Sequence, residues 1–226
     1  MDLFSWQRFF KNIPQLLKYF PITFEIVVIA TIFGITLGVL IALTRIHKIP
    51  VLDQIFAVYI SFMRGTPMLV QMLLVYYGLP MLLNLLFHLD VNGWSKITFV
   101  CVTFSLNQGA FLSEIFRSSI LAISVGQTEA GYSVGLTGWQ TFYRIVLPQA
   151  ARIAIPSFGV DLVGVFQNTS LAFLIGAMDI MGRAKTIGGS SGHYIESYVF
   201  VAIVFVTVSL LIKLFFTILD HKILRS

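Results

Sequence analysis

Apolar runs long enough to cross a lipid bilayer dominate this sequence. A helix needs about 20 apolar residues to span the hydrocarbon core, and four or five segments meet that requirement: residues 22–43, 55–86, 97–123, 153–180 and 198–219. Of the 226 residues, 57% are hydrophobic and 11% are charged, and the mean hydropathy is +0.88. This composition is typical of an integral membrane protein.

The spans are expected to be helices. Few runs show the two-residue alternation of an outer-membrane barrel strand, and a helix satisfies its own backbone hydrogen bonds in lipid. The first run is too long for a signal-peptide core and no small-residue cleavage site follows it, so we expect it to be retained. The sequence predicts an all-α integral membrane protein with about five transmembrane helices, forming one domain over residues 1–226.

Several function classes are disfavoured by composition. Cys101 is the sole cysteine, so no intrachain disulfide and no C-x-x-C metal or redox site is possible. We expect no metal site and no bound cofactor, because the chain also lacks the G-x-x-x-x-G-K-[S/T] phosphate loop. The net charge of +5 is scattered between apolar segments, which argues against nucleic acid. An intramembrane hydrolase needs a convergent nucleophile and base, yet the histidines fall near span ends or loops: His47, His88, His193 and His221.

The second apolar run is too long for one straight span and contains a predicted break. Gly65 can end a helix, Thr66 can cap a new one and Pro67 suits its first turn. Arg64 directly precedes this break. Its position is compatible with a side chain at the cytosolic interface or in a polar cavity.

Basic residues between the spans favour one orientation. Arg45, Lys48, Arg144 and Arg152, with Lys222 and Arg225 of the tail, would share the cytosolic face. The N-terminal segment 1–20 would then be extracytoplasmic. The bias is partial, because six other basic residues would lie outside: Arg8, Lys11, Lys18, Lys96, Arg183 and Lys185.

The segment 124–150 is polar and glycine-containing, and it predicts a cytosolic helix–turn–helix between the third and fourth spans. Ser124 with Gln127, and Thr137 with Gln140, have the spacing of helix-capping boxes. Gly135 between them can take the left-handed conformation that ends a helix. Apolar side chains follow at close spacing, and either the bundle itself or another protein could cover them: Ala130, Val134, Leu136, Trp139, Phe142 and Tyr143.

Ionisable and polar residues within spans are candidates for a transport path, because burying them in lipid is costly. Glu114 and Arg117 are spaced to neutralise each other. Asp161 has no basic residue one turn away, so it must face water, another span, or a cation such as an α-ammonium group. The other candidates are Gln167, Asn168, Thr169, Ser170, Asn107, Glu25 and Arg64. The hydroxyls of Thr169 and Ser170 can also bond the backbone of their own helix. Asn107 and Gln108 can join helices by hydrogen bonds, and Glu25 can contact water at the membrane interface.

Gly34 and Gly38 permit close helix approach.

The loop resembles a motif of ATP-binding-cassette (ABC) importer permeases. Glu129-Ala130-Gly131, Gly135 and Ile145-x-Leu147-Pro148 follow the pattern E-A-A-x3-G-x9-I-x-L-P, with Gly131 where alanine is usual. The stretches "RGTPMLVQ", "SEIFRSSI", "LPQAARIAIP" and "QNTSLAF" are similar to the polar amino acid uptake permeases, over about residues 20 to 220. Gln167 and Asp161 depart from that pattern, where lysine and an Asn-Glu or Asn-Gln pair are common.

The resemblance implies a multi-pass permease subunit in a bacterial inner membrane. It implies that loop 126–148 docks into a separate ATPase subunit, which binds ATP and magnesium, so the chain itself would not be an enzyme. The other implied partners are an extracytoplasmic solute-binding protein, a second permease subunit (a second copy or a paralogue) and an amino acid. The local sequence is most similar to cystine and sulphur amino acid members. The alternatives are a permease for another small solute or an ion-coupled secondary transporter, although we see no internal repeat.

Overall fold

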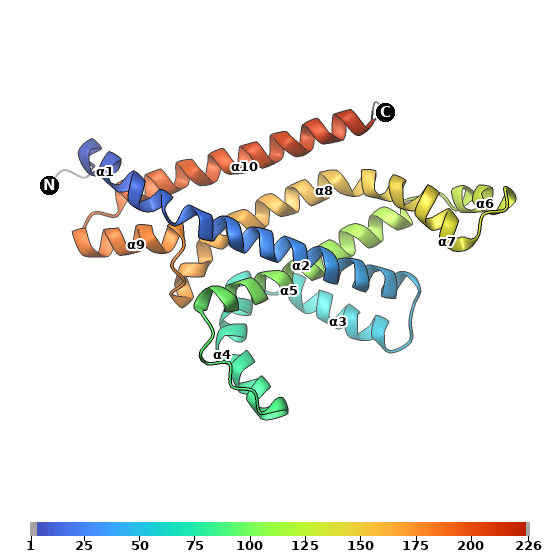
Figure 1. Ribbon diagram of the computed structural model, residues 1–226, viewed down its shortest axis with the longest axis horizontal. Coiled ribbons are helices and arrows are strands. Elements are labelled where there is room, and N and C mark those ends of the chain that lie inside the picture. Colours follow the sequence, from blue (N-terminus) through green and yellow to red (C-terminus); the bar gives the residue numbers. More distant parts are fainter. Residues whose placement is uncertain (1–3, 225–226) are drawn as a thin grey trace.

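The computed structural model describes residues 4–224, and all regular elements in that range are helical (Figure 1). Arg225 lies outside the described residues. The elements in chain order are α1 (Trp6–Leu17), α2 (Phe20–Ile46), α3 (Leu52–Gly65), α4 (Met68–Phe87), α5 (Lys96–Leu121), α6 (Val125–Ser133), α7 (Gly138–Thr141), the π-helical turn η1 (Phe142–Val146), α8 (Leu147–Asn168), the 3-10 helix η2 (Thr169–Ile175), α9 (Ile180–Ser191) and α10 (Ile195–Leu224).

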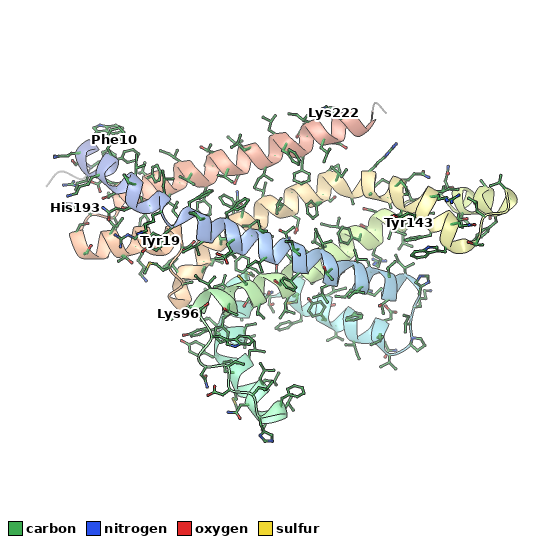
Figure 2. All side chains as sticks on the ribbon, viewed as in Figure 1. Phe10, Tyr19, Lys96, Tyr143, His193 and Lys222 are labelled. Carbon is green, nitrogen blue, oxygen red and sulfur yellow. The ribbon has the colours of Figure 1, made fainter. Side chains whose placement is uncertain are left out.

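Five helical segments are long and apolar enough to cross a membrane, which confirms the predicted fold class. They are Phe20–Ile46, Met68–Phe87, Lys96–Leu121, Gly138–Ile175 and Ile195–Lys222. In Figure 1, α2, α5, α8 and α10 run in roughly the same direction, with α1 and α9 at one end and α6 and α7 at the other. The side-chain view places Phe10 and His193 at the first end and Tyr143 near the second (Figure 2).

Helices α2 and α5 pack closely because glycines of α2 face side chains of α5. A Cβ atom on Gly34 would lie 2.4 Å from Cβ of Gln108, and one on Gly38 would lie 3.0 Å from Cβ of Leu112. The predicted close approach at these glycines is confirmed, and it joins two helices of the same chain. Small residues at a helix interface are the usual means of such approach in membranes.

The second apolar run is broken where the sequence predicts, but a different residue stabilises the break. The hydroxyl of Thr66 donates to the carbonyl of Phe62 at 2.7 Å, one turn earlier, so the prediction that Thr66 caps α4 is wrong. Pro67 takes the N-cap position of α4. Nε2 of buried Gln71 instead reaches back to the carbonyls of Met63 and Thr66 at 2.7 and 3.0 Å. These bonds satisfy carbonyls that the end of α3 leaves open.

Helix α4 points away from the bundle, across the direction of α5 (Figure 1). Only 11% of its most apolar stretch is buried, against 56% for α5. The N-terminal half of α4 packs on α5, where the ring centroids of Tyr76 and Phe99 lie 5.3 Å apart. Beyond Tyr76, Leu79 still packs against the core and Pro80 is buried, but most other side chains of α4 are exposed within residues 4–224.

Candidate functional site

The loop between α5 and α8 forms the turn that the sequence predicts. Gly135 has φ of +81°, a conformation that side chains with a Cβ rarely adopt. The capping box at Thr137 is also confirmed, because its hydroxyl accepts from the amide of Gln140 at 3.3 Å and Oε1 of Gln140 accepts from the amide of Thr137 at 2.9 Å. The turn is therefore fixed on both sides.

Two details of the loop differ from expectation. The box predicted at Ser124 is not formed, since its side chain makes no cap bond and Oε1 of Gln127 accepts from Nε2 of Gln149 at 3.4 Å instead. The second loop helix is also not separate. Helix α7 has only four residues and continues through the π-helical turn into α8. No glycine follows it to end the helix, and Pro148 lies just after the junction of the π-helical turn with α8.

The motif residues of the loop divide into a packed set and an exposed set. Gly131 is buried against α7, where a Cβ atom would lie 2.6 Å from Cγ2 of Thr141. Glycine at this position thus permits a close contact that alanine would obstruct. Ile145 and Leu147 are half-buried, whereas Glu129, Ala130, Gly135 and Pro148 are exposed.

An apolar surface remains uncovered at this end of the molecule. Val134, Trp139 and Tyr143 are 75%, 72% and 61% exposed, and the two aromatic rings stack with centroids 6.2 Å apart. The bundle therefore does not cover these side chains. The sequence alone did not decide between the bundle and another protein. The surface formed by exposed Glu129 and these apolar residues can receive another protein.

A hydrogen-bonded pair lies at mid-depth in the bundle. Nε2 of Gln108 donates to Oδ2 of Asp161 at 2.7 Å, joining α5 to α8. Gln108 is only 1% exposed, whereas Asp161 is half-buried. Asp161 thus meets a residue of another span, and that residue is a neutral amide. Oε1 of Gln108 is buried and has no hydrogen-bond partner within residues 4–224, whereas the half-buried carboxylate of Asp161 is an acceptor that a donor group can use.

A second polar contact lies on another face of α5. Nδ2 of Asn107 donates to Oε1 of Gln71 at 2.8 Å, which ties α5 to the helix break. Arg64 stacks over the ring of Phe111, with Cζ 5.5 Å from the ring centroid. Because Phe111 is ten residues before the end of α5, Arg64 lies about 15 Å from the end of that helix that leads into the loop.

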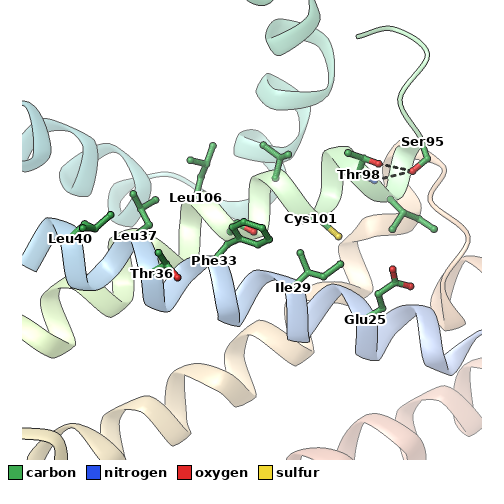
Figure 3. Close-up of a pocket in the computed structure, with 13 residues that line it drawn as sticks. Glu25, Ile29, Phe33, Thr36, Leu37, Leu40, Ser95, Thr98, Cys101 and Leu106 are labelled. Atoms are coloured by element: carbon green, nitrogen blue, oxygen red, sulfur yellow. Dashed lines mark hydrogen bonds between the residues drawn. The ribbon is translucent and has the colours of Figure 1, made fainter.

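Other predicted path residues are not gathered at this place. Nε2 of exposed Gln167 contacts Oγ of Ser209 on α10 at 3.4 Å, and Asn168 is exposed. The hydroxyls of Thr169 and Ser170 bond backbone carbonyls three residues earlier. Glu25 lines a separate groove between α2 and α5 (Figure 3), about 14 Å along α2 from Gly34 and therefore far from Gln108.

An ionic network joins three helices near the loop. The predicted pair is confirmed, with Arg117 Nη2 at 2.8 Å from Glu114 Oε2. Arg45 of α2 extends it, contacting Glu114 at 2.5 Å and Asp53 of α3 at 3.2 Å. The sequence could not indicate Arg45 because it lies 69 residues from Glu114. Gln71 was likewise missed, although a glutamine in an apolar run just after a break was a signal for it.

Five long apolar helices, a polar pair at mid-depth and an exposed helical loop before the fourth span define a membrane permease of the importer class. The chain belongs to the family described as "Binding-protein-dependent transport system inner membrane component", whose model matches residues 34–225. It is thus a multi-pass inner-membrane protein.

Relatives and solved structures agree with this assignment. The chain is 41% identical over 214 residues to the L-cystine transport system permease protein TcyL of Bacillus subtilis (strain 168), covering 95% of this chain and 89% of TcyL. It is 30% identical to the glutamate/aspartate import permease protein GltK of Escherichia coli O157:H7, covering 97% and 98%. A solved amino acid ABC transporter with histidines superposes with a TM-score of 0.85 at 25% identity, covering 97% of this chain and 99% of that one.

Proposed function

We propose that this chain is the membrane-spanning subunit of an ATP-driven amino acid importer and that Asp161 faces the translocation path. The observation that carries the proposal is the Asp161–Gln108 pair at mid-depth. A carboxylate in a span needs compensation, and this one has only an amide. The α-ammonium group of an amino acid can supply the missing positive charge during passage.

Helix α8 links the proposed transport path to the loop. The helical path runs without interruption from Gly138 through the π-helical turn to Ile175, and it includes Asp161. We infer that an ATPase subunit docks on the exposed surface of α6 and α7, binds ATP and magnesium, and moves this end of the helix. A displacement there is passed along the continuous helix to Asp161 and shifts it relative to Gln108. Such a change between two packings is what alternating access requires.

The remaining partners follow from the same proposal. An extracytoplasmic solute-binding protein delivers the amino acid, and a second permease subunit completes the path. Cystine is the proposed substrate, supported by the local sequence and by the 41% identity to TcyL. Uptake of labelled cystine in proteoliposomes, in competition with glutamate, glutamine and histidine, tests this choice. Inhibition by another amino acid at lower concentration than cystine would overturn it, and uptake without ATP would indicate an ion-coupled transporter.

The variant Asp161→Asn tests the transport site. It keeps the size of the side chain and an acceptor oxygen but removes the charge. We expect the maximal uptake rate to fall at least about tenfold, equivalent to about 1.4 kcal/mol, while the amount of ATPase-bound complex is unchanged. Asp90→Asn, in the exposed segment between α4 and α5, is the matched control and should transport normally.

Complex yield and uptake are measured on the same preparation. Loss of complex with Asp161→Asn would make Asp161 a structural residue. Normal uptake would remove Asp161 from the path.

A further inference from the structure

A groove between α8 and α10 contains a lysine with no partner in the described part of the chain. Helix α10 runs back along α8 (Figure 1), and the groove between the two helices has a volume of about 500 Å³. Lys213 of α10 lines this groove and is exposed. Within residues 4–224 its ammonium group forms neither a hydrogen bond nor a salt bridge.

Lys213 and Asp161 lie at nearly the same depth. The two helices are antiparallel, and Gly159 of α8 faces Phe216 of α10, because a Cβ atom on the glycine would lie 2.6 Å from Cγ of the ring. Asp161 is two residues from Gly159, in the direction that leads away from the loop. Lys213 is three residues from Phe216 in the same direction. At 1.5 Å per residue, the depths of the two charged residues differ by about 2 Å.

A lysine at mid-depth needs water or an anion, because an ammonium group in hydrocarbon is costly. Lipid headgroups lie about 15 Å from the bilayer centre, beyond the reach of this side chain. Asp220 lines the same groove, but it lies seven residues, or about 10 Å, along α10 from Lys213. We therefore expect the groove to be open to water at Lys213, with the ammonium group available to an anion that enters it.

An open strip of α8 connects the groove to Asp161. The open strip consists of Ser157, Val160 and Gly164, which are neighbours on the helix surface. Ser157 is exposed, Val160 is 76% exposed, and no atom lies within 4 Å of the position of a Cβ atom on Gly164. Asp161 lies beside Ser157 and Gly164 at one edge, whereas Val160 lines the groove at the other edge. The open strip thus has the Asp161 carboxylate at one edge and the Lys213 ammonium at the other.

We propose that Lys213 binds the α-carboxylate of the amino acid as it passes along the open strip, while Asp161 receives its α-ammonium group. A free amino acid carries both charges, so one substrate compensates both side chains. Cystine carries an ammonium group and a carboxylate at each of its two ends, and it thus offers a group of opposite charge to each edge. The inference rests on the proposed function, because it adds a second ligand to the same path.

Protection of a cysteine in the open strip tests the carboxylate contact. Val160→Cys is introduced in a Cys101→Ala background, and a membrane-impermeant methanethiosulfonate is applied to the purified permease–ATPase complex. We expect this cysteine to react, because it lies in a water-filled path. Leu214→Cys, at a 56% exposed position that does not line the groove, should react several-fold more slowly.

Two protecting ligands separate the carboxylate from the ammonium group. Cystathionine keeps both amino acid ends of cystine but has a thioether that does not exchange with the thiol, and the diamine bis(aminoethyl) sulfide has no carboxylate. Lys213→Gln should raise the cystathionine concentration for half-protection about tenfold, through loss of a charge-assisted hydrogen bond, and Lys213→Arg should restore it. The diamine concentration should not rise. Lys222→Gln, at an exposed position near the end of α10, is the matched control and should change neither value.

Other outcomes would overturn the proposal. An equal rise for both ligands in Lys213→Gln would mean that Lys213 acts through the structure of the open strip, and no rise for cystathionine would remove Lys213 from the path. Equally slow reaction of Val160→Cys and Leu214→Cys would mean that lipid or protein covers the open strip. Normal uptake in Asp161→Asn would contradict the proposed function alone, because the response of half-protection to Lys213→Gln is measured without uptake.

Discussion

At the residue scale, the positions that set the geometry are glycines and buried amides. Gly34 brings α5 close enough for Gln108 to pack on α2, and Gln108 in turn holds Asp161. Gly131 gives α6 its close contact with Thr141. The contacts of Gln108 with Asp161 and of Gln71 with Asn107 thus use neutral amides, which can join helices in a bilayer at lower cost than a charge.

Gly135→Val should uncouple transport. Gly135 has φ of +81° in open space, so the effect of valine is backbone strain, about 1–3 kcal/mol at a β-branched residue. The turn between α6 and α7 would change, and we expect ATP-dependent uptake to fall several-fold in membranes that contain normal amounts of the chain. Gly192→Val is the matched control, because Gly192 has φ of +73° in open space at the far end of the molecule. Equal uptake in the two variants would contradict a coupling role for the turn.

At the element scale, the sequence predicts the spans well because length and apolar composition are local properties. The five long helices, the break after Gly65 and the turn at Gly135 all have local signals. Prediction of side-chain partners was correct for Thr137 with Gln140 and for Glu114 with Arg117, but it failed elsewhere. Ser124 and Thr66 were predicted to cap helices. The hydroxyl of Thr66 instead donates to the carbonyl of Phe62, and Oε1 of Gln127 accepts from the side-chain amide of Gln149. Asp161 was expected to need a partner, yet only the packing of α5 identifies Gln108.

Gln71→Leu should loosen the junction between α3 and α4. The change removes the bonds to the carbonyls of Met63 and Thr66 and leaves Asn107 without its acceptor. Each buried group left unsatisfied costs about 1–3 kcal/mol, so we expect a lower melting temperature of the detergent-solubilised complex and faster amide hydrogen exchange in residues 62–70. The control is Gln54→Leu, at an exposed position of α3. Unchanged exchange in Gln71→Leu would show that the break is stable without the amide.

At the scale of the whole molecule, one continuous helical segment connects the two candidate sites. The exposed surface of α6 and α7 lies at one end of the segment Gly138–Ile175, and Asp161 lies within it. The ionic network of Arg45, Glu114 and Arg117 adds a second connection, because Arg117 is seven residues before Ser124 at the start of the loop. Movement of the loop therefore reaches both α8 and α5, the helices that share the Asp161–Gln108 bond.

Glu129→Ala should separate coupling from substrate recognition. Glu129 is exposed on α6, and its carboxylate is free to meet a basic side chain or backbone donors of an ATPase subunit. We expect the maximal uptake rate and the amount of co-purified ATPase to fall several-fold, because an ion pair at the rim of such an interface contributes about 0.2–1 kcal/mol and a buried one more. The half-saturation concentration for the amino acid should stay the same, since Glu129 lies far along the molecule from Asp161. Thr128→Ala, a half-buried neighbour on the same helix, controls for changes in α6 itself. A normal maximal rate with a raised half-saturation concentration would place Glu129 in the permeation path instead.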